Sequence, residues 1–255
     1  MPHEPPETWV EEFRRRVPTL SFADKTVPCQ PVLRLQFDGT EEAFHAALYR
    51  LLVATANLRS PAEEFDLTEP DDMALEVMTS VPMALRLLEL LVLLQRPQRI
   101  LEIGTFIGTS ALGMARALGP GGRLVTIEQG ARFAALAREN VQRNGVADRV
   151  TLLEGDAAQV LRTLSPSQPF DLIFLDADKE RYGLYFTLLD PLLAPGGLLI
   201  ADDVLFLGDV LNDEPKTSKG RGVKRFLAMA RRQPNYRTLL LPISTGMLLM
   251  RKQGP

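Results

Sequence analysis

Acidic side chains gather where apolar runs of this 255-residue chain give way to helical patterns. Five such runs have the aliphatic composition of buried parallel strands, and each delivers a carboxylate at or just past its end. The five carboxylates are those of Glu102, Glu128, Asp156, Asp176 and Asp202. Because the carboxyl ends of parallel strands lie at one edge of a sheet, we expect these side chains to meet there. Carboxylates are costly to cluster unless a cation neutralises them, so the pattern indicates a cationic ligand, a metal ion or both.

A glycine turn follows the first run, in the segment Arg99-Ile-Leu-Glu-Ile-Gly-Thr-Phe-Ile-Gly-Thr-Ser110. Gly104 and Gly108 permit a tight turn and a close approach of a ligand. A dinucleotide fingerprint would read G-x-G-x-x-G, whereas Glu102 here precedes a G-x-x-x-G turn. The acidic group suits an ammonium or a sulfonium and would repel a pyrophosphate, so an NAD-dependent dehydrogenase is the weakest candidate. A plain structural turn is the alternative interpretation.

Two further carboxylates have the positions expected of nucleoside ligands. Glu128 follows Gly108 by about twenty residues, where a carboxylate binds the ribose hydroxyls of an adenosine-containing ligand. Asp156 lies in Glu154-Gly-Asp-Ala157 and is able to accept a hydrogen bond from an adenine amino group. It is equally suited to cap the following helix, and the sequence leaves both roles open.

The segments Asp176-Ala-Asp-Lys179 and Asp202-Asp203 follow the fourth and fifth runs. Three carboxylates from adjacent loops would form a hard oxygen site without histidine or thiolate, which suits Mg2+, Mn2+ or Ca2+. The alternative is that Asp178 and Asp203 are solvated helix-cap residues. Lys179 lies three residues after Asp176, and nearby positive charge would lower the pKa of its ammonium. We therefore expect Lys179 to serve as a general base.

Composition argues against several classes of protein. The net charge is -3 and no basic run stands out, so we expect no nucleic-acid partner. The single Cys29 excludes an internal disulfide, and the presence of only His3 and His45 argues against a histidine triad or a zinc site. The longest apolar run, Leu87–Leu94, contains Glu89 and is too short to cross a bilayer. Since the first residues lack a signal-peptide pattern, we expect a cytoplasmic protein that does not enter a membrane.

The elements that must position these residues alternate between strand and helix. The expected strands are Ile100–Ile103, Arg123–Ile127, Val150–Leu153, Leu172–Leu175 and Leu198–Ala201. The expected helices are Ser110–Leu118, Arg132–Asn144, Ala157–Leu164, Glu180–Leu193 and Gly222–Arg232. Such alternation predicts an α/β fold with a parallel sheet and right-handed crossovers. The last two runs, Tyr236–Leu241 and Met247–Arg251, are joined by a short connection and predict a terminal antiparallel hairpin.

Residues 1–60 are expected to form an N-terminal helical appendage, and residues 61–255 to form the main domain. Helical patterns cover Glu7–Arg16 and Thr40–Leu58, with Thr40 as the N-cap of the second. Packing or a dimer contact is the simpler interpretation of this appendage, and a lid over the substrate is the alternative. A further pattern over residues 71–94 predicts helix with a break at Pro82.

The chain resembles the class I S-adenosylmethionine-dependent O-methyltransferases of the cation-dependent catechol and caffeoyl-coenzyme A type. The resemblance runs from about Met78 to Lys252. It rests on Met78-Thr-Ser80, Leu101-Glu-Ile-Gly-Thr-Phe-Ile-Gly-Thr-Ser-Ala-Leu112, Phe170-Asp-Leu-Ile-Phe-Leu-Asp-Ala-Asp-Lys179 with Tyr182 and Tyr185, Gly196-Gly197 and Asp202-Asp-Val-Leu205. It implies a Rossmann-like, seven-stranded, mostly parallel sheet with helices on both faces and an antiparallel C-terminal hairpin.

The resemblance also implies roles for individual residues. The methionine end of S-adenosylmethionine would be lined by Met78, Ser80, Glu102, Gly104 and Ser110. The ribose would be held by Glu128, and the adenine would lie near Asp156 and Ala157. The divalent cation, Mg2+ or else Mn2+ or Ca2+, would be bound by Asp176, Asp202 and Asp203. Asp176 would also face the cofactor, Lys179 would be the catalytic base, and the protein would form a homodimer.

The implied reaction is in-line transfer of the sulfonium methyl group to a phenolic oxygen of a small catechol-like acceptor whose two hydroxyls bind the cation. Two departures from the family pattern stand out, since members usually carry Asn where Asp203 stands and Leu207 replaces a polar residue of the plant enzymes. The first 60 residues match no family pattern. Two alternatives stay open: a metal-independent O-methyltransferase of a small natural product, and a cofactor-binding protein without catalysis.

Overall fold

The computed structural model describes residues 40–56, 82–165 and 167–254. The chain divides into two compact units, Met1–Thr55 and Ala56–Pro255. In the first unit, helix α3 (Glu41–Ala56) begins after Thr40, whose hydroxyl accepts a hydrogen bond from the amide of Ala43 at 3.2 Å. The expected Thr40 cap is thus confirmed. The helical pattern at Glu7–Arg16, the pattern before Pro82, and the side chains of Met78 and Ser80 lie outside the described residues.

The second unit is built on one seven-stranded sheet with the strand order β3-β2-β1-β4-β5-β7-β6. The strands are β1 (Arg99–Ile103), β2 (Arg123–Glu128), β3 (Val150–Glu154), β4 (Phe170–Leu175), β5 (Leu193–Ala201), β6 (Tyr236–Leu241) and β7 (Met247–Lys252). The first five are parallel, and β7 pairs antiparallel with both β5 and β6. This confirms the predicted α/β sheet and its terminal hairpin. The strand order reverses direction between β1 and β4. In open α/β sheets, ligands bind at the carboxyl ends of the strands beside such a reversal.

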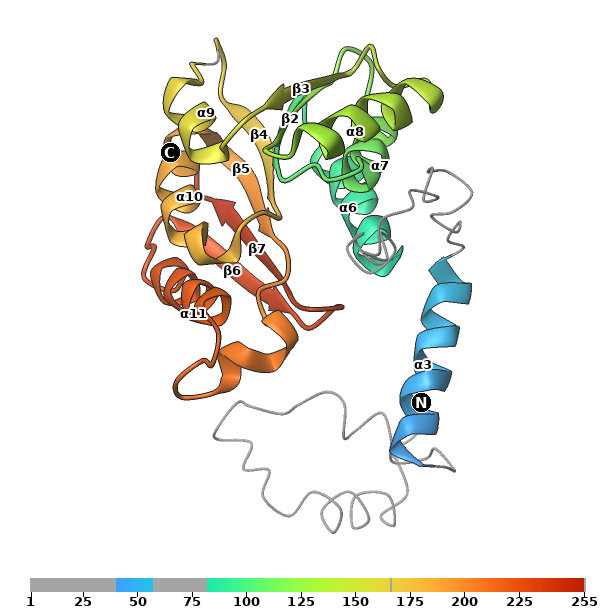
Figure 1. Cartoon of the computed structure of the whole chain (residues 1–255), viewed down its shortest axis with the longest axis vertical. Coiled ribbons are helices and arrows are strands. Elements are labelled where there is room, and N and C mark those ends of the chain that lie inside the picture. The colour runs from blue at the N-terminus through green and yellow to red at the C-terminus, as the bar shows by residue number, and fades with distance from the viewer. Residues whose placement is uncertain (1–39, 57–81, 166, 255) are drawn as a thin grey trace, which may run out of the picture. The chain divides into compact units, whose positions relative to one another are not determined.

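Helices cover both faces of the sheet (Figure 1). One face carries α6 (Pro82–Gln95), α7 (Thr109–Ala117) and α8 (Ala131–Arg143), and the other carries α9 (Ala157–Thr163), α10 (Tyr182–Leu189) and α11 (Ser218–Ala230). Each face buries its own apolar cluster, with Ile100 and Phe174 on the α6 side and Leu101 and Ile173 on the α10 side. The central strands read as continuous apolar runs because both of their faces are covered.

Two of the expected helices begin or divide differently from the sequence prediction, whereas the expected break at Pro82 coincides with the start of a helix. Pro82 opens α6, so this helix begins where the sequence predicts a break, and proline is tolerated in the first turn because its missing amide hydrogen is not needed there. The expected helix Glu180–Leu193 is divided into the short helix η1 (Lys179–Arg181), α10 and η2 (Asp190–Leu192). The second division falls at Pro191, which has no amide hydrogen to continue the α-helical hydrogen bonds. Helix α11 starts at Ser218 because Thr217 caps it, its hydroxyl accepting from the amide of Gly220 at 2.9 Å.

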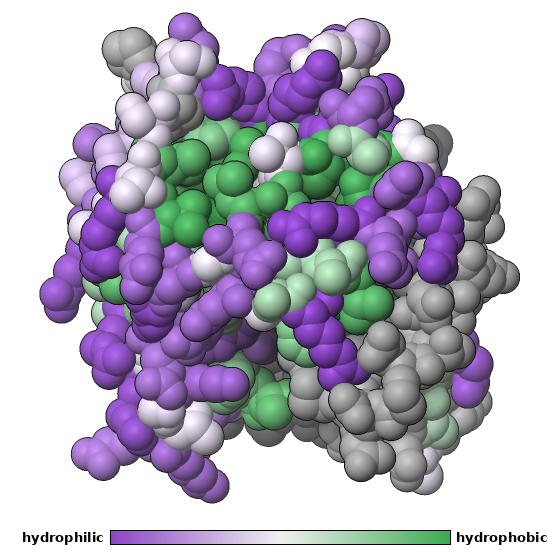
Figure 2. Space-filling model, turned by 45° about the horizontal axis from the view of Figure 1, so that its top comes forward, coloured by the Kyte–Doolittle hydropathy of each residue, from purple (hydrophilic) through white to green (hydrophobic). Residues whose placement is uncertain are grey.

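Apolar side chains also reach the surface of the molecule. Figure 2 shows one face on which they form a band bordered by polar and charged residues. Among the described residues, no helix is long and apolar enough to cross a membrane.

Candidate active site

Backbone hydrogen bonds carry the parallel pairing one residue past the strand ends. The amide of Gly104 donates to Ile127 at 3.0 Å, that of Asp176 to Ile103 at 2.9 Å, and that of Asp202 to Leu175 at 3.0 Å. The residues that leave β1, β4 and β5 are therefore fixed by the sheet itself. The structure thus brings these strand ends together at one edge, as the sequence predicts.

The turn after β1 requires glycine because the backbone at Asp176 lies against Gly104. Gly104 has φ +93°, and a β-carbon built on it would lie 2.0 Å from the backbone oxygen of Asp176. Gly108, also at φ +93°, precedes α7, and its carbonyl accepts from the amide of Leu112 at 2.9 Å. Positive φ strains any residue with a β-carbon, so both glycines are needed for the turn.

Glu102 is fully buried inside this edge, with 0% of its surface exposed. Its Oε1 accepts from the hydroxyl of Ser110 and its Oε2 from that of Thr126, both at 2.5 Å. The hydroxyls of Thr126 and Thr105 are hydrogen-bonded in turn. Burial raises the pKa of Glu102 to about 7, although the two hydrogen bonds oppose the shift. Two residues expected at the methionine end of the cofactor, Glu102 and Ser110, are therefore in direct contact.

Sequence reasoning missed Thr126 as a partner of Glu102. The two residues are directly opposite in the register of β1 and β2. The available signal was a lone hydroxyl in the otherwise aliphatic stretch Leu124-Val-Thr-Ile127 of a buried strand. A buried hydroxyl needs a hydrogen-bond partner, and a carboxylate on the adjacent strand supplies one.

Glu128 ends β2 and holds the backbone of the glycine turn. Its Oε2 accepts from the amide of Phe106 and its Oε1 from that of Gly130, both at 2.8 Å. The carboxylate therefore links the turn after β1 to the turn that leads into α8, at the edge where the sequence predicts a ribose.

Asp156 caps α9, as one of its two open interpretations predicted. Its Oδ1 accepts from the amide of Gln159 at 2.9 Å, and Ala157 follows as the first residue of the helix. The carboxylate also pairs with Arg181, which approaches it with both terminal nitrogens. The hydrogen bond from Arg181 holds the pKa of Asp156 below its usual value. The sequence did not indicate this ion pair.

Lys179 lies between two of the expected metal ligands. Its ammonium is 2.5 Å from Oδ1 of Asp176 and 3.6 Å from Oδ2 of Asp203, and its side chain is 12% exposed. Burial alone would lower the pKa of Lys179, but Tyr182 and the two carboxylates outweigh burial and raise it. As the structure stands, Lys179 is therefore a buried ammonium ion and not yet the free base that the sequence led us to expect.

Asp202 and Asp203 complete this cluster. Burial, followed by the charge of Asp176, raises the pKa of Asp202 to about 7, and its Oδ1 accepts from the amide of Asp203 at 2.8 Å. Asp203 has φ +58° and caps no described helix, and its Oδ1 is buried without a hydrogen-bond partner among the described residues. Asp178, by contrast, caps η1 by accepting from the amide of Glu180 at 3.1 Å, as its alternative interpretation predicted.

The charges of this cluster do not balance when Lys179 and the three carboxylates of Asp176, Asp202 and Asp203 are all ionised. Three carboxylates face one ammonium, which leaves two negative charges in a poorly solvated place. In the part of the chain that the structure describes, no three carboxylate, imidazole or thiolate groups converge closely enough to hold a metal ion. The residual charge and the unsatisfied oxygen of Asp203 nevertheless fit a divalent cation with oxygen ligands.

Tyr182 lies next to this cluster and contacts the backbone at the ends of β4 and β5. Its fully buried hydroxyl lies 3.0 Å from the backbone oxygen of Asp202 and 3.3 Å from that of Leu175. Because burial raises the pKa of this phenol above its usual value, Tyr182 is suited to positioning Asp202 and not to taking up a proton.

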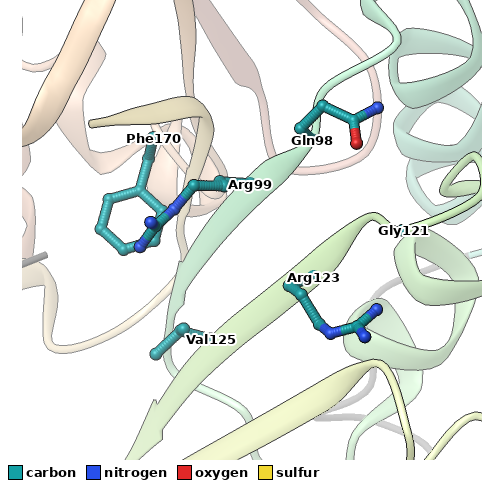
Figure 3. A pocket seen from close by; sticks show the side chains of 6 residues that line it. All are labelled: Gln98, Arg99, Gly121, Arg123, Val125 and Phe170. Carbon is teal, nitrogen blue, oxygen red and sulfur yellow. The ribbon is translucent and has the colours of Figure 1, made fainter. Parts of the chain in front are cut away.

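Two cavities lie away from the carboxylates. One of about 370 Å³ lies at the amino ends of β1, β2 and β4, and Figure 3 shows the guanidinium of Arg99 stacked on Phe170 there, 5.1 Å from the ring centroid. A second of about 260 Å³ lies between α8 and β3 and includes Ala137, Val141 and Leu152. Neither includes the acidic residues of the strand ends.

Comparison with known proteins agrees with this arrangement. Residues 64–253 match a family model described as O-methyltransferase. A catechol O-methyltransferase of Niastella koreensis is 40% identical over 146 residues, which are 56% of this chain and 66% of that protein. A catechol O-methyltransferase of Mycobacterium tuberculosis is 45% identical over 114 residues, 45% of this chain and 51% of that protein. The matches thus span about two thirds and one half of these two curated relatives.

A solved structure extends the similarity over most of the chain. The O-methyltransferase TomG from Streptomyces achromogenes, involved in tomaymycin synthesis and solved in complex with S-adenosylmethionine, has 31% sequence identity and a TM-score of 0.66. The alignment covers 88% of this chain and 95% of that one.

Proposed function

The chain belongs to the O-methyltransferase family, and from that premise we propose that it transfers the methyl group of S-adenosylmethionine to a hydroxyl of a small catechol-like acceptor. We propose further that the reaction depends on a divalent cation, with Mg2+ as the first candidate. The observation that supports this most strongly is the cluster of Asp176, Asp202 and Asp203 around Lys179, which carries two uncompensated negative charges when all three carboxylates are ionised.

The cofactor would lie along the carboxyl edge of the sheet. We propose that Glu102, Gly104 and Ser110 form the methionine end, together with Met78, Ser80 and Asp176. Glu128 would hold the ribose, and Asp156 and Ala157 the adenine. The tight turn at Gly104 and the anchored carboxylate of Glu128 support this placement, because both leave backbone and acidic groups close to one edge. Binding of S-adenosylmethionine by TomG is consistent with it.

The three aspartates would hold the cation through carboxylate oxygens. When bound, the cation lowers the pKa of a coordinated hydroxyl and fixes its oxygen in place. Tyr182 keeps the backbone of Asp202 in position. Once its ion pair with Asp176 is broken, the ammonium of Lys179 would release its proton to solvent, because loss of the neighbouring negative charge lowers its pKa. The neutral amine would then take up the acceptor proton.

A second candidate is methyl transfer without a metal. The ion pair between Lys179 and Asp176 favours it, since the ammonium already neutralises part of the acidic cluster. The homodimer, the cytoplasmic location and the separate role of residues 1–60 stay predictions from the sequence.

Mass-spectrometric detection of methyl transfer tests the proposal. The protein is incubated with S-adenosylmethionine and a panel of catechols, with Mg2+ in one series and a chelator in the other. Product only with the cation is the expected result. Product in both series would support the metal-free candidate, and bound cofactor without product on any acceptor would contradict both.

A further inference from the structure

A second charged pair lies at the same edge of the sheet, between the carboxyl end of β3 and η1. Nη1 of Arg181 is 2.5 Å from Oδ2 of Asp156, and Nη2 is 3.3 Å from Oδ1. Two parallel contacts of this kind fix both the position and the plane of a carboxylate. The pair plays no part in the proposed methyl transfer, and it links the predicted adenine site to the segment that begins with Lys179.

Contacts of its side chain and of its backbone fix the position of Arg181. Its guanidinium carbon lies 5.4 Å from the centroid of the Tyr185 ring. The backbone of η1 is pressed against α11, where a β-carbon on Gly222 would come within 2.4 Å of the carbonyl oxygen of Lys179. The hydroxyl of Ser218 also bonds to Glu180. The guanidinium therefore extends from a fixed backbone and approaches Asp156 in one orientation.

The hydrogen bonds of Asp156 leave one position open. Its Oδ1 receives the amide of Gln159 and one nitrogen of Arg181, and the amide of Ala158 also lies near the carboxylate, whereas the direct bond to Oδ2 comes from the other nitrogen of Arg181. A carboxylate oxygen accepts about two hydrogen bonds, so Oδ2 retains an acceptor position. The neighbouring Gly155 donates its amide to the backbone oxygen of Glu128 at 2.9 Å, which places Asp156 beside the proposed ribose ligand.

We propose that Arg181 is a positioning residue for nucleobase recognition, which orients Asp156 so that the open position of Oδ2 accepts the exocyclic amino group of adenine. The inference rests on the proposed function, because it takes the adenosine part of S-adenosylmethionine as the ligand. Arg181 does not contact the reacting groups. Its effect is on which base the site prefers.

Calorimetric binding of two demethylated cofactors tests this assignment. S-adenosylhomocysteine carries the amino group, and S-inosylhomocysteine carries a carbonyl oxygen in its place, which would face Asp156 unfavourably. We expect the folded wild-type protein to prefer the adenosyl compound by tenfold or more. Arg181→Met should weaken the adenosyl compound by about tenfold and leave the inosyl compound unchanged, so that the preference is largely lost. Arg181→Lys, which keeps the charge but not the two-point contact, should lose part of it.

Arg138→Met is the matched control. Arg138 also pairs with a carboxylate near the end of β3, at 3.4 Å from Glu154, but both side chains are largely exposed and neither caps α9. The control should keep the full preference. If Arg181→Met weakened the binding of both compounds equally, its role would be purely structural and the proposal would be overturned. An unchanged preference in Arg181→Met, or a wild-type protein that does not prefer the adenosyl compound, would also overturn it. If Arg181→Met does not fold by thermal melting, Arg181→Lys decides by the same ratio.

Failure of the proposed function has a different signature. A wild-type protein that binds neither compound would contradict the cofactor assignment itself. A protein that binds S-adenosylhomocysteine with a preference independent of Arg181 would contradict only the role of Arg181.

Discussion

The backbone oxygen of Asp176 lies so close to Gly104 that a β-carbon on this glycine would be 2.0 Å from it. This contact joins the turn that leaves β1 to the first residue after β4, at the point where the strand order reverses. The proposed methionine end of the cofactor and the proposed cation site therefore share one piece of backbone.

Gly104→Ala is expected to disrupt this junction. The new β-carbon meets backbone, which cannot move aside as a side chain can, and the residue has φ +93°. We expect a loss of several kcal/mol in the free energy of unfolding, about 3 or more. Urea unfolding measures it. Gly113→Ala in α7 is the control, because its β-carbon would lie no closer than 3.5 Å to Glu89 and the helix favours alanine. Equal stability of the two variants would contradict the account of this turn.

Lys179→Met removes the only positive charge shown in contact with Asp176 and Asp203 among the described residues. We expect methyl transfer to fall by about 100-fold or more, because both the base and the charge balance are lost. Without its ammonium, the cluster should gain more from a divalent cation. Thermal melting should therefore show a larger rise in Tm on addition of Mg2+ for Lys179→Met than for the wild type.

Lys224→Met controls for the loss of a lysine elsewhere. Its ammonium donates to the backbone oxygens of Asn212 and Asp213 and contacts none of the three aspartates in the structure. Its Mg2+ response should equal that of the wild type. If Mg2+ raised Tm equally in Lys179→Met and in the wild type, the proposed charge balance would be wrong.

Glu102 makes a prediction about pH. Its folded-state pKa is raised from 4.5 to about 7, so between these values the folded protein binds a proton that the unfolded chain has lost. The free energy of unfolding should therefore fall as the pH rises through this window, by up to about 3 kcal/mol, and level off above it.

Glu102→Gln isolates this contribution. Asp202 is shifted in the same direction, so only the difference between the wild type and the variant reports on Glu102. Urea unfolding of the cofactor-free protein from about pH 5 to about pH 8 should give a shallower decline for the variant. Parallel curves for the two proteins would mean that Glu102 does not titrate in this range.

The sequence predicted the sheet and its acidic edge for a simple reason. Parallel strands must place their carboxyl ends together, so a carboxylate after each run is sufficient to locate the edge. Partners across the fold were harder to foresee. Thr126 bonds to Glu102 across 24 residues and Arg181 to Asp156 across 25, and no spacing within one element indicates either contact.

The protonation state of Lys179 could not be read from the sequence either. It depends on how close the ammonium lies to Asp176 and Asp203, and on how far burial excludes water. The end of α10 at Leu189, within the expected helix Glu180–Leu193, had in contrast an available signal in Pro191. A proline near the end of a helical pattern predicts a boundary just before it.

Crystals grown with Mn2+ and S-adenosylhomocysteine give the most direct test of the cation site. Diffraction data collected above the manganese absorption edge locate the metal without reference to activity. We expect one anomalous peak within bonding distance of carboxylate oxygens of Asp176, Asp202 and Asp203, with the ammonium of Lys179 no longer against Asp176. Clear density for the cofactor with no anomalous peak at these three carboxylates would contradict the account.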